Sequence, residues 1–109
     1  MRHDADDTSL VKSVALGDTR AMQSLYQRHH ECIYAFLRTR GADAEQARDL
    51  VHDTMLDVWK SAAKFRGGST VRTWMLTIAR NKFIDRIRAA GRLDYVDDVG
   101  DMLDETPDA

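Results

Sequence analysis

Apolar residues recur along the chain at helical spacing, and no stretch alternates between apolar and polar residues for long enough to predict a strand. The pattern predicts four helices, at about residues 8–16, 18–40, 43–65 and 69–90. Glycines that can stop a helix follow three of them, at Gly17, Gly41 and Gly91. Residues that can cap a helix start stand at Asp18, at Asp43 with Gln46 as its capping-box partner, and at Ser69.

Each of the three longer predicted helices has one apolar stripe that we expect to face a common core. The stripes consist of Met22, Leu25, Tyr26, Ile33, Phe36 and Leu37; of Ala47, Leu50, Val51, Thr54, Val58, Ala62 and Phe65; and of Trp74, Ile78, Ala79, Phe83 and Ile87. The sequence therefore predicts an all-α fold, a compact bundle of about four helices with short connections.

The composition is that of one small globular domain, with 109 residues of which 43% are hydrophobic and 31% charged. The single cysteine excludes a disulfide within the chain, and no apolar run approaches the roughly 18 residues that span a membrane. The acidic N-terminus does not resemble a secretory signal, so we expect a cytoplasmic protein. We expect a flexible N-terminus at residues 1–8, a helical domain at 9–92 and an acidic, flexible linker or tail at 93–109.

The formal net charge of −2 is the result of three very different segments. Residues 1–59 carry a net charge of −3, residues 60–92 a net charge of +8, and residues 93–109 a net charge of −7. The dense basic block indicates a polyanionic partner such as nucleic acid. A solvated helix face is the alternative interpretation, and the acidic tail could neutralise the block in the free protein.

The third predicted helix has a second face beside its apolar stripe. Its residues recur at helical spacing and combine acids with apolar side chains: Asp49, His52, Asp53, Leu56 and Trp59, bordered by Met55. Such a face suits a basic, partly apolar protein partner. A solvated face with Trp59 packed in the core is an equally good interpretation of the same residues.

The loop before the fourth helix and that helix itself form a second candidate surface. Two glycines allow the backbone to approach a ligand closely, and hydroxyls and a helix N-terminus can hold a phosphate. Arginines on the helix would hold a phosphodiester backbone, while an asparagine can read a base edge, so the set suits an unstacked, single-stranded base. The candidate residues are Phe65, Arg66, Gly67, Gly68, Ser69, Thr70, Arg72, Arg80, Asn81 and Arg86.

Three segments carry a resemblance to a known family. They are residues 49–59 (DLVHDTMLDVW), 65–69 (FRGGS) and 73–81 (TWMLTIARN). In this order and spacing they closely resemble region 2 of the extracytoplasmic-function (ECF) sigma factors of bacterial RNA polymerase, over about residues 9–92. The resemblance implies a transcription initiation factor domain that acts by binding, with no catalytic residue, no cofactor and no metal.

The resemblance also implies roles for individual residues. Residues 49–53 would dock on a helical coiled coil of the largest subunit of core RNA polymerase. His52 stands where glutamine is usual and Asp53 where glutamate is usual, and Asp57 stands where some relatives have a basic residue. The loop at residues 65–70 would capture a flipped base of the minus-ten promoter element, on the non-template single strand. Asn81, with Arg80 and Arg86, would read the adjacent bases.

The family implies two further features. Anti-sigma factors commonly cover the polymerase-docking and promoter-reading surfaces, so we expect such a partner here. Most members also carry a helix-turn-helix domain that reads the minus-thirty-five element. We therefore expect this chain to be the first domain of a longer protein.

Two other function classes are compatible with parts of the sequence. An enzyme or metal site could use His29, His30 and Cys32, with His52 or Asp53 nearby, but a single cysteine and no recognisable catalytic order make this improbable. A stand-alone regulator that reads duplex DNA with the basic helix remains an alternative, although the glycine-rich loop does not fit a helix-turn-helix.

Overall fold

The computed structural model describes the backbone of residues 2–91 and the side chains of residues 7–91. The predicted acidic linker or tail at residues 93–109 therefore lies outside the described residues.

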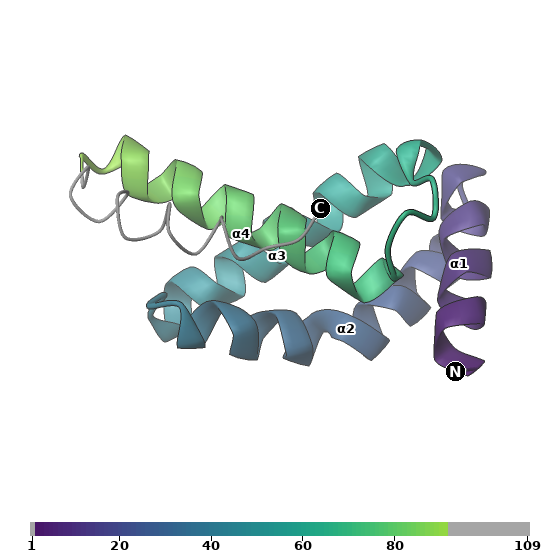
Figure 1. The fold of residues 1–109 in the computed structure, drawn as a ribbon, viewed down its shortest axis with the longest axis horizontal. Helices are drawn as coiled ribbons and strands as arrows, with labels where there is room; N and C mark the ends of the chain where they lie inside the picture. The colour runs from purple at the N-terminus through teal and green to yellow at the C-terminus, as the bar shows by residue number, and fades with distance from the viewer. Residues whose placement is uncertain (1, 92–109) are drawn as a thin grey trace.

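The described chain is built from helices alone. They are α1 (Arg2–Ala15), α2 (Thr19–Thr39), α3 (Ala44–Ser61), the short 3₁₀ helix η1 (Ala62–Lys64) and α4 (Val71–Ala89). Helices α2, α3 and α4 pack against one another, while α1 lies across the end of the bundle where α2 begins (Figure 1). The predicted all-α class, with about four helices and short connections, is confirmed.

Acidic side chains start α2 and α3 as the sequence predicts. Asp18 Oδ1 accepts hydrogen bonds from the backbone N–H groups of Arg20 (3.0 Å) and Ala21 (3.2 Å). Asp43 and Gln46 form a reciprocal capping box, in which each side chain accepts a hydrogen bond from the other residue's backbone N–H. Both caps satisfy N–H groups that have no partner within the helix, so the two helix starts are fixed by local chemistry.

The start of α4 differs from the prediction by one residue. Thr70 is the N-cap, because its Oγ1 accepts a hydrogen bond from the backbone N–H of Thr73 (3.1 Å). Ser69, the predicted cap, instead donates from Oγ to the carbonyl oxygen of Thr70 (3.0 Å). Serine and threonine are both good caps, so propensity alone could not choose between neighbours.

The prediction that the third helix continues to residue 65 was also wrong. Helix α3 ends at Ser61, and a single 3₁₀ turn follows before the chain becomes extended at Phe65. Ser61 Oγ donates to the carbonyl oxygen of Asp57 (2.6 Å). Such side-chain bonds compete with the helical backbone ladder, which is consistent with a helix end at this point.

The first helix begins at Arg2, six residues before the predicted start, so the expected flexible segment at residues 1–8 is helical from Arg2 onward. Asp7 is buried and joins α1 to α2. Arg28 Nη1 donates to Asp7 Oδ1 (2.9 Å), and His29 Nε2 lies 2.7 Å from Asp7 Oδ2. A buried carboxylate needs such partners. Because they come from another helix, local sequence patterns could not predict that Asp7 is buried.

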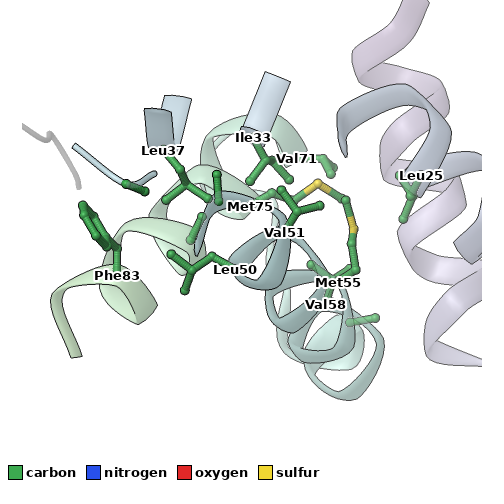
Figure 2. Close-up of a cluster of buried hydrophobic side chains, with 14 of the residues drawn as sticks. Leu25, Ile33, Leu37, Leu50, Val51, Met55, Val58, Val71, Met75 and Phe83 are labelled. Carbon is green, nitrogen blue, oxygen red and sulfur yellow. The ribbon is translucent and has the colours of Figure 1, made fainter. Parts of the chain in front are cut away.

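The core lies where α2, α3 and α4 meet (Figure 2). Its fully buried large side chains include Ile33 and Leu37 from α2, Leu50 and Val58 from α3, and Met75 from α4. Burying a side chain of this kind contributes about 1.5–3 kcal/mol relative to leaving it in water. Helix α1 adds further apolar contacts at the end of the bundle, from Val11 and Val14.

The predicted stripes of α2 and α3 are largely correct, and that of α4 is correct at Ala79, Phe83 and Ile87 but wrong in its first half. Its buried row is Val71, Met75, Ala79, Phe83 and Ile87, with Ile84 beside it. Trp74 and Ile78, which were predicted to lie in the core, are only partly buried against its edge. Because α4 has apolar residues on several sides, the spacing of its apolar residues did not identify a single core-facing side.

The corrected cap gives a stability test. Thr70→Ala should lower the free energy of unfolding by about 1 kcal/mol, because it removes the side chain that satisfies the N–H of Thr73. Ser69→Ala is the matched control and should change that free energy by less than about 0.5 kcal/mol. Urea unfolding followed by circular dichroism measures both, and a larger loss for Ser69→Ala would contradict the assigned cap.

Candidate functional site

The acidic-apolar face of α3 (Asp49, His52, Asp53, Leu56 and Trp59) lies on the surface of the bundle. Leu56 is 47% exposed and Trp59 is 37% exposed, and both are among the large apolar residues that the fold leaves in contact with water. The alternative in which Trp59 packs in the core is therefore wrong. Met55, predicted to border this face, is buried and lines the groove beside it. Exposed aromatic and aliphatic side chains flanked by acids are typical of a protein interface.

An apolar groove lies beside this face, between α3 and α2. It has a volume of about 390 Å³ and is lined by His52, Met55, Leu56 and Trp59 of α3 and by Thr19, Met22 and Tyr26 of α2. Met22 and Tyr26 were predicted from the sequence to face the core, but both line this groove. The one signal of this groove in the sequence was the apolar stripe of α2, which is wider than a core-facing stripe needs to be. In the structure Tyr26, at the edge of that stripe, is 37% exposed.

The other edge of the acidic-apolar face meets α4 through ion pairs. Arg86 Nη2 lies 3.1 Å from Asp53 Oδ2, and Arg86 Nη1 lies 4.0 Å from Asp49 Oδ2. One helical turn away, Lys82 Nζ lies 3.3 Å from Asp57 Oδ2. The structure thus brings together residues that the sequence analysis assigned to two separate surfaces.

The glycine loop between η1 and α4 is anchored by aromatic packing. The rings of Phe65 and Trp74 lie with their centroids 4.8 Å apart at an interplanar angle of 44°. Arg66, Gly67, Gly68, Ser69 and Thr70 follow on the surface and are exposed. Phe65, a candidate base contact, is half-buried and packs against Trp74, so part of its ring holds the start of the loop on α4.

The two glycines of this loop differ in what the fold demands of them. Gly67 has a φ of +81°, in the left-handed region that favours glycine. Gly68 lies outside that region, and a Cβ placed on it would meet no atom within 4 Å. The chain's own fold therefore requires glycine at position 67 but not at position 68.

The polar residues of α4 lie along the side of the helix that the core leaves open. Arg72 and Asn81 are exposed, while Arg80 and Arg86 are half-buried. Arg80 Nη2 donates to Asn81 Oδ1 over 3.5 Å. This contact orients the asparagine amide so that its NH₂ group points away from Arg80. The candidate residues of α4 lie on more than one side of the helix, since Arg86 faces α3 through its ion pairs while Asn81 is exposed.

The residues of the rival metal site are engaged in other contacts. His29 is buried against Asp7, and the ring of His30 stacks on Tyr26 with its Nδ1 2.9 Å from the carbonyl oxygen of Tyr26. Among the residues that the structure describes, no three His, Cys, Asp or Glu side chains gather closely enough to hold a metal ion. Within the same part of the chain, no helix combines the length and apolar character that crossing a membrane requires.

Comparison with known proteins identifies the family to which the chain is similar. A family model described as Sigma-70 region 2 matches residues 25–93. The chain is 33% identical over 89 residues to the ECF RNA polymerase sigma factor SigM of Mycobacterium tuberculosis, which covers 82% of this chain and 45% of the relative. It is 37% identical over 68 residues to the RNA polymerase sigma factor YlaC of Bacillus subtilis, covering 62% of this chain and 39% of the relative.

A third relative is the ECF RNA polymerase sigma factor RpoE of Cereibacter sphaeroides, with 38% identity over 72 residues, 65% of this chain and 40% of the relative. The chain therefore spans less than half the length of these three curated relatives. No solved structure matches the chain closely enough to count as a relative.

Proposed function

The chain belongs to the sigma-70 region 2 family of transcription initiation factors, and on that premise we propose that it acts by binding two partners at once. The acidic-apolar face of α3 docks on the largest-subunit coiled coil of core RNA polymerase. The glycine loop and α4 hold the non-template strand of the minus-ten promoter element. The chain carries out no chemical step in this role.

The observation that carries the proposal is the exposure of Leu56 and Trp59 next to Asp49 and Asp53 on one helix. Apolar side chains that remain in water contribute little to folding, and an exposed patch of them favours a binding partner. Acids at the rim of such a patch favour a basic partner and fix its orientation. The groove beside Leu56 and Trp59 would accept an apolar side chain from that partner.

The loop supports the promoter-binding half of the proposal. Gly68 has space around it that the fold does not use, so a base or a phosphate can approach its backbone closely. The N-terminus of α4, capped by Thr70, follows directly after this loop, and a helix N-terminus favours an anion. Extruding one base from the duplex costs a few kcal/mol, which these contacts must offset.

Helix α4 supplies the flanking contacts. Arg72, Arg80 and Arg86 would neutralise phosphates, which gives affinity without sequence preference. Asn81 would contact a base edge, with its amide oriented by Arg80. We further propose that these surfaces work in the cytoplasm and that an anti-sigma factor can cover them, as the family resemblance implies.

The docking face can be tested by reversing one charge. Asp49→Lys should abolish binding to core RNA polymerase while leaving the helical circular dichroism unchanged, because Asp49 is 62% exposed and its removal costs the fold little. Glu31→Lys on the exposed surface of α2 is the matched control, with the same change of charge. Equal binding by both variants in a pull-down with core polymerase would refute the docking assignment.

The loop can be tested at its two glycines. Gly68→Ala should leave the free energy of unfolding unchanged but weaken binding of a minus-ten non-template oligonucleotide by about fivefold, the loss expected for roughly 1 kcal/mol of contact energy. Gly67→Ala should lower stability by about 1–2 kcal/mol because of the left-handed φ. Urea unfolding and fluorescence anisotropy measure the two effects, and undiminished strand binding by Gly68→Ala would argue against a base in this loop.

The base-reading role of Asn81 predicts a selective effect. Asn81→Ala should weaken binding by about 1–3 kcal/mol for oligonucleotides with the preferred base at one or two positions, and much less for those without it. Anisotropy titrations against a set of minus-ten oligonucleotides with single-base changes provide the measurement. A uniform loss across the whole set would mean that Asn81 contacts the sugar-phosphate backbone instead.

A further inference from the structure

The ion pairs between α3 and α4 form a seam that joins the two proposed surfaces. The acids Asp49, Asp53 and Asp57 recur every four residues along one row of α3. The bases Lys82 and Arg86 occupy a matching row of α4. Asp53 pairs with Arg86 and Asp57 with Lys82, so the two rows run in opposite directions. We name these five residues the α3–α4 seam.

Arg86 occupies the key position in the seam. Its two terminal nitrogens face the carboxylates of Asp53 and Asp49, at 3.1 and 4.0 Å. An arginine that binds a phosphate in a bidentate way uses a pair of nitrogens in the same manner. The carboxylates therefore already occupy and neutralise the group that would hold the promoter strand.

The same geometry limits the docking face. Asp49 and Asp53 are the acids that would attract a basic group of the polymerase, and each already faces a cation of this chain. All three side chains are partly exposed, at 38% for Arg86, 45% for Asp53 and 62% for Asp49. Ion pairs in contact with water contribute little stability, so a partner on either side can displace them at low cost.

We propose that Arg86 couples polymerase docking to promoter-strand binding through this seam. The inference rests on the proposed function and adds to it a direction of regulation. When a basic group of the polymerase pairs with Asp49 and Asp53, Arg86 loses its ion pairs with them and can bind a phosphate of the promoter strand. Because linkage is reciprocal, a strand that binds Arg86 also frees the two acids and strengthens docking by the same factor. In the free chain, part of the positive charge that would bind DNA is thus neutralised by the two acids, and polymerase binding makes it available.

The size of the coupling follows from the exposure of the pairs. One exposed ion pair contributes about 0.2–1 kcal/mol, which corresponds to a factor of at most about fivefold in either binding constant. The effect should decrease as salt screens the seam, with a screening length of about 8 Å at 0.15 M ionic strength.

The strand-binding side is tested with fluorescence anisotropy of a labelled minus-ten non-template oligonucleotide, without polymerase. Asp53→Asn should tighten binding by about twofold to fivefold, because Arg86 loses its nearest carboxylate. Asp85→Asn on α4 is the matched control, since it removes the same charge and no ion pair joins Asp85 to another described residue. The gain of Asp53→Asn over this control should disappear when Arg86→Ala is also present. An equal gain with and without Arg86 would show a general charge effect and overturn the inference.

The polymerase side makes a prediction of opposite sign. Arg86→Ala should weaken strand binding but tighten binding to core polymerase by about twofold to fivefold, since it frees two acids of the docking face. Arg88→Ala removes the same charge without touching the seam and should not tighten polymerase binding. Equal polymerase affinities for the two variants, both with unchanged helical circular dichroism, would overturn the inference.

The outcomes separate this inference from the function beneath it. If Arg86→Ala alone leaves strand binding unchanged, the promoter-binding role proposed for Arg86 is wrong. If Arg86→Ala weakens strand binding but Asp53→Asn gives no gain over Asp85→Asn, the promoter-binding role stands and the coupling is wrong.

Discussion

The packing of α3 between α2 and α4 is the constraint on which the rest of the structure depends. Its row of Ala47, Leu50, Val51, Thr54 and Val58 is buried from both sides, so the rotation of the helix about its axis is fixed. With the rotation fixed, every other residue of α3 has a determined direction. Leu56 and Trp59 must remain in water next to α2, and the acids must face α4. The core thus positions the exposed side chains of the proposed docking face.

The electrostatic consequence is that the two proposed surfaces share a border. A helix with a net acidic face packed beside a basic helix forms ion pairs wherever their rows meet, as Asp53 and Asp57 do with Arg86 and Lys82. Asp57 illustrates the point. It stands where some relatives have a basic residue, and in the structure its carboxylate lies 3.3 Å from Lys82 Nζ. Charges that differ from the family pattern therefore have to be interpreted together with the helix they face.

The features that the sequence predicted correctly are those governed by local chemistry. The caps at Asp18 and Asp43, the all-α class and the buried rows of α2 and α3 depend on residues within a few positions of one another. The features that it missed depend on distant partners. Asp7 can be buried because Arg28 and His29 of α2 bind its carboxylate. The groove is lined from two helices, by Tyr26 of α2 and Trp59 of α3. In α4 the core positions Ala79, Phe83 and Ile87 were predicted correctly. Trp74 was chosen over Met75 because both are apolar and only packing decides between them.

The central claim is that this sigma-70 region 2 domain binds the promoter as an opened single strand rather than as a duplex. Anisotropy of three labelled minus-ten DNAs, the non-template strand, the template strand and the intact duplex, tests it most directly when measured with core polymerase present. The account predicts tightest binding to the non-template strand, because the space at Gly68 and the amide of Asn81 suit an unpaired base. Tightest binding to the intact duplex would contradict it and would favour a regulator that reads double-stranded DNA.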